Sequence, residues 1–151
     1  MNEKQLSVSA IKEGTVIDHI PSDSLFKVIS ILGLDKVKTL VTFGNSFESK
    51  KLGKKGIIKV SDVFFTTEEI NKIALVAPTA KLNIIRNFEV VEKMKVEIPD
   101  NVQGIIKCVN PKCITNHQKV MTKFTVISKD EVQLKCHYCE KITSKDNLDM
   151  I

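Results

Sequence analysis

Four cysteines are the residues in this sequence whose type and spacing most clearly indicate chemistry. Two lie in the stretch CVNPKC, two lie in CHYC, and 22 residues separate the pairs. Each short pair can wrap a tight turn around one metal ion, and four thiolates at the corners of a tetrahedron suit Zn²⁺. The predicted ligands of one zinc ion per chain are Cys108, Cys113, Cys136 and Cys139.

The predicted metal site is structural, because sulfur fills all four positions and none is open for water or substrate. Metal binding would therefore supply folding energy to the surrounding segment. Spacing alone leaves iron open as the metal, and four unrelated buried cysteines are the alternative to any metal site. His117 and His137 are expected to be surface residues, since four cysteines already complete the coordination shell.

The other polar residues do not suggest a catalytic site. Asp18 and His19 are adjacent, but consecutive strand residues point to opposite faces, so we do not expect a catalytic pair. The glycine-rich phosphate-binding motifs GxxxxGK[ST] and GxGxxG are absent. The lysine-rich stretch KKLGKKGIIK could bind phosphate or form a solvated hairpin loop. Its lysines are Lys50, Lys51, Lys54, Lys55 and Lys59.

Length and composition are those of one ordinary domain or two small ones, with 151 residues of which 42% are hydrophobic. We expect a cytoplasmic protein with no membrane partner, because no stretch resembles a signal peptide or a membrane span. Reduced thiols in that compartment favour a metal over disulfides. The formal charge of +5 falls to about +3 once four thiolates and one Zn²⁺ are counted, which is weak evidence for any partner.

The elements that must position these residues follow from hydrophobic periodicity and turn signals. Residues 1–98 predict the order βαββαβ, the pattern of a ferredoxin-like α+β sandwich. Strands 38–47 and 56–65 are expected to form a hairpin with a long basic loop. The expected strands are 6–11, 15–20, 38–47, 56–65 and 81–98, the last as one long or two short strands, and the expected helices are 22–33 and 70–77.

Capping residues and apolar spacing define the two predicted helices. The first is expected to begin at Ser22 or Asp23 and to end at Gly33. Thr66 and Glu69 predict a capping box in front of the second. The inward residues are expected to be Leu25, Ile29 and Leu32 in the first helix and Ile70, Ile73 and Ala74 in the second.

A change in composition near VEIPDNVQG predicts a domain boundary between residues 98 and 99. Residues 99–151 contain three short predicted strands, 104–109, 123–128 and 132–138. Such a unit is too small for a dependable hydrophobic core without a staple. We therefore expect a small all-β domain of zinc-ribbon or rubredoxin-like type, held by its metal.

Four segments together resemble the regulatory chain of aspartate carbamoyltransferase: AIKEGTVIDHIP, GKKGIIKV, NIIRNFEVVEK and LKCHYCEK. The resemblance spans essentially the whole chain. It implies a nucleotide-binding allosteric domain at 1–98 and a four-cysteine zinc domain at 99–151 that contacts the catalytic chain. It further implies a chain without catalytic activity that pairs as a homodimer. Such dimers bridge two catalytic trimers, giving six catalytic and six regulatory chains in pyrimidine biosynthesis.

The same resemblance implies the ligands and their site. ATP or CTP, often with UTP beside CTP, would shift the catalytic chains between low- and high-activity states. Asp18 would accept hydrogen bonds from ribose hydroxyls, and His19 and Lys93 would meet phosphates. The family commonly has a tyrosine where this chain has Phe88, so a hydroxyl is lost there. The implied nucleotide site comprises Val8, Ala10, Ile11, Val16, Asp18, His19, Lys55, Lys59, Asn83, Ile85, Phe88, Val90 and Lys93.

Two other interpretations remain open at the level of sequence. A zinc-ribbon nucleic-acid-binding protein is the main alternative, although the chain has no Trp and only one Tyr for base stacking. A small-molecule enzyme with an unrecognised site is the third. The regulatory interpretation predicts no nucleic-acid partner, and salt-sensitive DNA or RNA binding would favour the alternative.

Overall fold

The computed structural model describes residues 10–151, which form two compact units divided between Glu97 and Ile98. Val8 and most of the strand expected at 6–11 lie outside the described residues. Ala10 and Ile11, at the end of that expected strand, are not in a strand. Within residues 10–151 no helix is long and apolar enough to cross a membrane.

The first unit is built on a five-stranded antiparallel sheet with the strand order β2-β3-β1-β4-β5. Its first four strands in chain order, with one helix after β1 and one after β3, have the ferredoxin-like arrangement, and β5 extends the sheet by a hairpin. The predicted α+β class is confirmed. The strands are β1 Gly14–Pro21, β2 Val41–Ser49, β3 Gly53–Ser61, β4 Lys81–Arg86 and β5 Glu89–Lys95.

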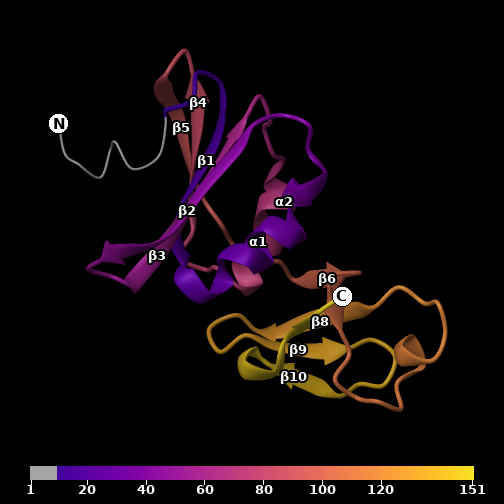
Figure 1. The fold of residues 1–151 in the computed structure, drawn as a ribbon. Coiled ribbons are helices and arrows are strands. Elements are labelled where there is room, and N and C mark those ends of the chain that lie inside the picture. The colour runs from indigo at the N-terminus through magenta and orange to yellow at the C-terminus, as the bar shows by residue number, and fades with distance from the viewer. Residues whose placement is uncertain (1–9) are drawn as a thin grey trace. The chain divides into compact units, whose positions relative to one another are not determined.

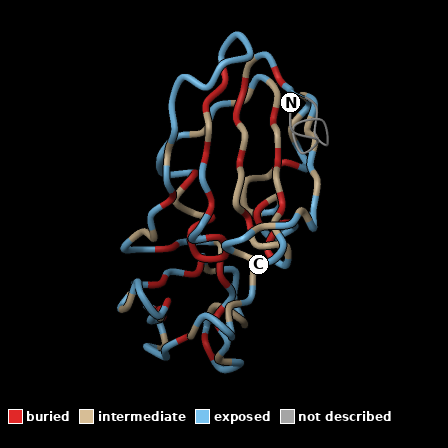
Figure 2. The backbone as a smooth tube through the Cα atoms, turned by 90° about the vertical axis from the view of Figure 1, so that its left-hand side faces the viewer, coloured by how far each residue is buried: buried red, intermediate tan, exposed pale blue. Residues whose placement is uncertain are grey.

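One face of this sheet carries the core of the unit. Strand residues alternate between faces, so Ile17, Ile58 and Leu82, each 0% exposed, point to the same side. Figure 1 shows α1 (Leu25–Ile31) and α2 (Thr67–Asn71) on one side of the sheet. In Figure 2 the central strands alternate between buried and half-buried stretches, and the half-buried positions belong to the opposite, open face.

The first helix is shorter than predicted. A 3-10 helix at Ser22–Ser24 precedes α1, whose N-cap is Ser24 without a side-chain hydrogen bond, so the predicted caps were wrong. The buried positions of α1 are Leu25, as predicted, and Val28; Ile29 and Leu32, predicted to point inward, are only half-buried. Gly33 ends it as predicted, with φ 65° in the left-handed region that glycine tolerates, and a 3-10 helix at Leu34–Lys36 follows.

The second helix begins as predicted. The Thr66 hydroxyl accepts from the Glu69 amide at 3.2 Å, and the Glu69 carboxylate accepts from the Thr66 amide at 3.0 Å. This capping box starts α2, which tightens into a 3-10 helix at Lys72–Leu75. The predicted inward residues are confirmed, since Ile70, Ile73 and Ala74 are at most 1% exposed.

The hairpin of β2 and β3 is confirmed, but its predicted long basic loop is wrong. The ladder runs to the pair of Ser49 and Gly53, so the turn contains only residues 50–52. Lys54 and Lys55 consequently lie on β3, where strand pairing fixes the direction of their side chains. The lysine-rich stretch is therefore largely part of the sheet.

The segment 81–98 forms two strands, one of the two outcomes expected from its sequence. β4 and β5 pair through a tight turn at Asn87 and Phe88, whose φ angles are 52° and 65°. Two consecutive residues with positive φ are the signature of a type I′ hairpin turn. Phe88 is thereby presented at the tip of the hairpin, 64% exposed.

The second unit is small and all-β, as predicted. Its main sheet has the order β10-β9-β8-β6, and β7 pairs with β11. The predicted strand at 123–128 is confirmed, and the other two are shorter than expected. Strand β6 falls where the sequence suggested only an interruption, because Asn101–Gln103 pairs with β8. The elements are β6 Asn101–Gln103, β7 Ile106–Lys107, β8 Lys123–Ser128, β9 Gln133–Cys136, β10 Ile142–Ser144 and β11 Asp149–Met150, with 3-10 helices at Ile114–Asn116 and Lys145–Asn147.

Candidate functional site

The four cysteines converge at one point of the second unit. Their sulfur atoms all lie within 4.8 Å of one another. Two of these separations join the two sequence pairs: Cys108 Sγ lies 3.6 Å from Cys139 Sγ, and Cys113 Sγ lies 3.8 Å from Cys136 Sγ. A tetrahedral zinc ion with Zn–S bonds of about 2.3 Å requires sulfurs about 3.8 Å apart. The cluster therefore fits a structural metal ion.

Local backbone structure holds the two cysteine turns. The Cys113 carbonyl accepts from the Asn116 amide at 2.9 Å, and the Cys136 carbonyl accepts from the Glu140 amide at 3.0 Å. The Asn116 side chain donates to the Cys108 carbonyl at 3.0 Å. These bonds orient the ligands independently of any ion, as outer-shell contacts do in metal sites.

The protonation of the thiols bears on how the site takes up a cation. Burial raises the pKa of Cys108 to about 12 and also raises the pKa of Cys136. At Cys139 burial acts to raise the pKa, but it is outweighed by hydrogen bonds from the Lys141 backbone, the Asn110 side chain and the neighbouring thiols. These bonds lower the pKa of Cys139 to about 7. A metal ion that binds thiolates must displace the remaining protons, so binding releases acid.

Both histidines near the cluster are exposed, which confirms their prediction as surface residues. The ring nitrogen Nε2 of His117 lies 2.7 Å from the Pro111 carbonyl oxygen. The His137 ring makes an edge contact with Tyr138, with centroids 5.0 Å apart. The metal cluster comprises cysteines only.

Strand register brings most of the predicted nucleotide residues together on the open face of the first sheet. Val16 of β1 lies opposite Lys59 of β3 and Asn83 of β4, and Asn83 lies opposite Lys93 of β5. Directly opposite residues share a face of the sheet, so these four side chains form one row across four strands. Asp18 occupies the same face two residues further along β1.

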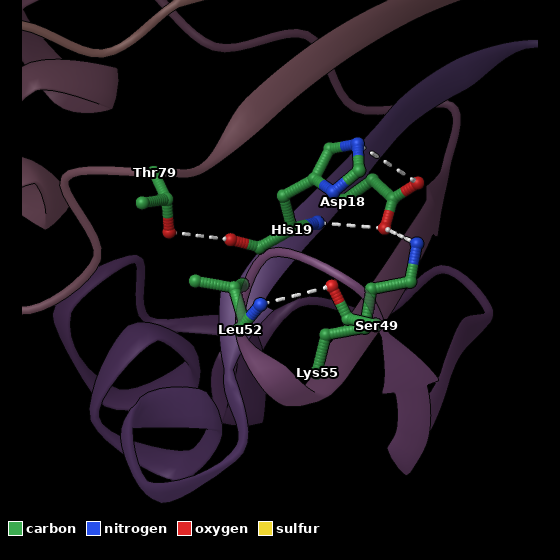
Figure 3. Close-up of polar contacts among 6 residues, drawn as sticks. All are labelled: Asp18, His19, Ser49, Leu52, Lys55 and Thr79. Carbon is green, nitrogen blue, oxygen red and sulfur yellow. Dashed lines mark hydrogen bonds and ion pairs between the residues drawn. The ribbon is translucent and has the colours of Figure 1, made fainter.

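Asp18 and His19 are in contact, contrary to the prediction that they point apart. The pairing of β1 with β3 shifts between Ile17 and Ile20, and His19 has a φ of 58°. This bulge breaks the alternation of faces. The Asp18 carboxylate consequently accepts from the His19 amide at 2.6 Å, and its other oxygen lies 3.9 Å from His19 Nε2 (Figure 3).

Two further contacts hold this corner of the sheet. The Lys55 ammonium, only 16% exposed, lies 2.9 Å from Asp18 Oδ1, and the Thr79 hydroxyl donates to the His19 carbonyl at 2.9 Å (Figure 3). Among the described residues no group hydrogen-bonds to His19 Nδ1, which is buried. The corner therefore holds an imidazole nitrogen and cations beside a single carboxylate.

Burial and neighbouring charges shift the pKa values of two groups at this corner. Burial lowers the pKa of His19; Asp18 opposes this effect, and Lys55, Lys81 and Lys51 add to it. Burial likewise lowers the pKa of Lys59, again against the influence of Asp18. A bound anion would relieve both effects, because it stabilises the charged form of each group.

The other end of the open face is apolar. Ile85 lies opposite Gly14 of β1 and opposite Val90 of β5, and Val90 is 48% exposed. Ile11 is buried and Ala10 is exposed just before β1, and the Phe88 amide donates to the Lys12 carbonyl at 3.0 Å. The predicted residues therefore extend from an apolar end to a basic end along β1.

Lys81 and Thr79 are functional candidates that sequence reasoning missed. Lys81 lies opposite Asp18 and influences His19. Strand periodicity could have found Lys81, since it precedes Asn83 by two residues and must share its face. The Thr79 contact depends on a turn closed by the Ala80 amide and the Ala77 carbonyl at 3.1 Å. Pro78 signals this turn but not its contact with His19.

The fold and its two sites define a metal-binding protein with an open sheet face suited to an anionic ligand. The family model of the aspartate carbamoyltransferase regulatory chain, allosteric domain, matches residues 6–97, and the model of its metal binding domain matches residues 100–149. The chain belongs to the family of aspartate carbamoyltransferase regulatory chains.

Full-length similarity to relatives supports the same conclusion. The chain is 58% identical over 150 residues to the aspartate carbamoyltransferase regulatory chain of Phocaeicola vulgatus, covering 99% of this chain and 97% of the relative. It is 56% identical over 146 residues to that of Pyrococcus horikoshii, covering 95% and 96%. The resemblance inferred from the four sequence segments is confirmed.

Proposed function

We propose that this chain is a non-catalytic, cytoplasmic regulatory subunit that binds ATP or CTP and changes the activity of aspartate carbamoyltransferase catalytic chains. The observation that carries the proposal is the polarity of the open sheet face. Its basic end, around His19 and Lys55, suits a triphosphate, and its apolar end, around Ile85 and Val90, suits a base. A nucleotide has the same polarity along its length.

The contacts can be assigned by chemistry. The Asp18 carboxylate accepts from ribose hydroxyls, and His19 and Lys93 donate to phosphate oxygens. Lys59 lies between ribose and phosphate, and Lys55 leaves its ion pair with Asp18 to reach phosphate. The remaining residues line the base: Val8, Ala10, Ile11, Val16, Asn83, Ile85, Phe88 and Val90.

We assign the metal to the unit at 99–151 and propose that it is Zn²⁺, which suits four thiolates without an open position. This unit then presents a fixed surface to the catalytic chain, while residues 1–98 take the nucleotide and form the regulatory homodimer. Two catalytic trimers and three such dimers give six chains of each kind. Both tasks are binding tasks, so the chain needs no reacting group of its own.

Regulation follows from differential affinity. A nucleotide that binds the chain better in one quaternary state shifts the population toward that state, by no more than the ratio of its two affinities. ATP and CTP can share one site and act oppositely if they prefer opposite states. UTP beside CTP would strengthen the CTP effect in the same way.

The test is reconstitution with purified aspartate carbamoyltransferase catalytic trimers. We expect a larger assembly in sedimentation and an aspartate saturation curve that ATP and CTP each displace. A chain that neither assembles with the trimers nor alters their response would refute the proposal. Salt-sensitive binding of DNA or RNA by such a chain would instead support a nucleic-acid role.

A further inference from the structure

The segment before β1 is fastened to the turn between β4 and β5 by three contacts. The Lys12 carbonyl accepts from the Phe88 amide at 3.0 Å. The Glu13 carboxylate accepts from the Asn87 amide at 3.3 Å with one oxygen and lies 3.4 Å from Arg86 Nη1 with the other. One carboxylate thus holds both the backbone of the turn and the side chain beside it.

Arg86 is fixed from a second direction. Its guanidinium carbon lies 4.3 Å from the centroid of the Phe64 ring, which places the cation over an aromatic face. The Glu13 carbonyl also accepts from the Asp62 amide at 3.0 Å, just beyond β3. Glu13 therefore links the segment before β1 both to the chain after β3 and to the β4–β5 turn.

The turn that Glu13 holds has an unusual backbone. Asn87 and Phe88 both have positive φ, and a bulky residue such as phenylalanine adopts this region only where its surroundings impose it. The amides of both residues donate into the segment before β1, to Glu13 and Lys12. Ile11, adjacent to Lys12, is thereby fixed relative to the exposed Phe88.

We propose that Glu13 and Arg86 form a clamp that positions the base-binding end of the nucleotide site. This inference rests on the proposed function, which assigns Ile11 and Phe88 to the base. Neither clamp residue contacts the ligand; both are positioning residues that set the separation of the segment before β1 and the hairpin tip. Loss of the clamp should weaken recognition of the base and leave recognition of the phosphates intact.

The test compares ATP and CTP with inorganic tripolyphosphate, which has phosphates and no base, by calorimetry on the full chain. We expect Glu13→Ala to weaken the binding of ATP and CTP by about threefold to tenfold, since the substitution removes one hydrogen bond and one partly exposed ion pair. Binding of tripolyphosphate should be unchanged. A merely structural role would weaken all three ligands by the same factor.

Two variants separate the parts of the clamp, and a third is the control. Glu13→Gln keeps an oxygen for the Asn87 amide but removes the charge, so its loss should be smaller than that of Glu13→Ala. Exchanging the charges, Glu13→Arg with Arg86→Glu, should recover part of the loss, because it restores the ion pair but not the bond to Asn87. Asp100→Ala, which breaks the ion pair with Lys129 in the second unit, is the matched control and should bind like the wild type.

The clamp proposal is overturned if Glu13→Ala binds ATP and CTP as the wild type does. It is equally overturned if Glu13→Ala weakens the binding of tripolyphosphate by the same factor as the binding of ATP and CTP. It is also overturned if the charge-exchanged variant binds ATP and CTP more weakly than both of its component single variants, Glu13→Arg and Arg86→Glu. A wild-type chain that binds neither ATP nor CTP would overturn the proposed function itself. The two failures are therefore distinguishable in one series of titrations.

Discussion

The two units of this chain differ in what occupies their interiors. In the first, most buried side chains of the sheet and helices are aliphatic, among them Ile17, Ile58 and Leu82. In the second, three of the four cysteines are themselves buried, at 2% exposure or less. The second unit also buries apolar side chains, among them Phe124 and Leu134, and a metal ion can supplement so small a core. The comparison indicates that the first unit is stabilised by packing, whereas the second combines a small packed core with a cysteine cluster that can coordinate a metal ion.

The two candidate sites differ in how accessible they are to a ligand. The cysteine cluster is closed, with every position filled by a protein sulfur, as a structural site should be. The sheet face is open and carries the partly exposed titratable side chains Asp18, His19 and Lys59. A closed site suits permanent occupation, whereas an open one suits a ligand that comes and goes.

The largest effect is expected from Cys136→Ser or from removal of the metal. Either change should unfold residues 98–151, because structural metal binding contributes on the order of 10 kcal/mol to folding. The first unit should keep its core. Metal analysis and amide hydrogen exchange on the full chain would measure both outcomes.

Restoring Zn²⁺ after chelation is the control for this prediction, since it should return exchange protection to the second unit of the wild type but not of Cys136→Ser. Equal loss of protection in both units would show that their stabilities are not separate.

The converse substitution is Ile58→Ala in the first unit. Truncating this fully buried side chain should lower the free energy of unfolding by about 2 to 5 kcal/mol. The metal content of the chain should stay at one ion, because the cysteine cluster does not depend on that core. Urea unfolding monitored together with metal release would decide the point, and early metal loss would count against it.

Lys93→Ala tests the phosphate end of the open face. If its ammonium meets the triphosphate, removing a charge-assisted hydrogen bond of about 1.5 to 3 kcal/mol weakens ATP and CTP roughly tenfold to a hundredfold. Both nucleotides should weaken alike because they share their phosphates. Lys27→Ala, on an exposed position of α1, is the matched control for calorimetry. Loss of CTP with normal ATP binding would exclude a phosphate contact at Lys93.

The smallest effect concerns pH. His19 has a pKa lowered by burial and by neighbouring lysines, against the opposing effect of Asp18. Phosphates beside the imidazole should raise this pKa, so binding takes up a proton and affinity should rise as the pH falls through the ordinary histidine pKa of 6.5. The expected change in nucleotide affinity over this fall in pH is about threefold. In His19→Gln the slope should flatten to that of the nucleotide alone, and identical slopes in the two proteins would contradict the assignment.

The sequence predicted the features that depend on local chemistry. The capping box at Thr66 and the stop at Gly33 follow from side-chain and backbone preferences, and both were confirmed. The cysteine cluster was also predictable, because two short-spaced pairs can each form a turn that presents sulfur atoms to one ion.

Features that depend on long-range pairing could not be predicted. Strand β6 forms because Asn101–Gln103 finds β8, although its residues favour a turn. The contact between Asp18 and His19 depends on a bulge where β1 pairs with β3. The link from Glu13 to Arg86 joins residues far apart in the chain, so no local pattern indicates it.

The separation of nucleotide and metal between the two units is tested most directly by titrating CTP into the full chain before and after metal removal. We predict one class of CTP site with the same affinity in both samples, within about twofold, while hydrogen exchange shows that residues 98–151 have unfolded. Loss of CTP binding on metal removal would contradict the assignment of the nucleotide to the open face of the first sheet. A CTP affinity that Lys93→Ala leaves unchanged in both samples would contradict it as well.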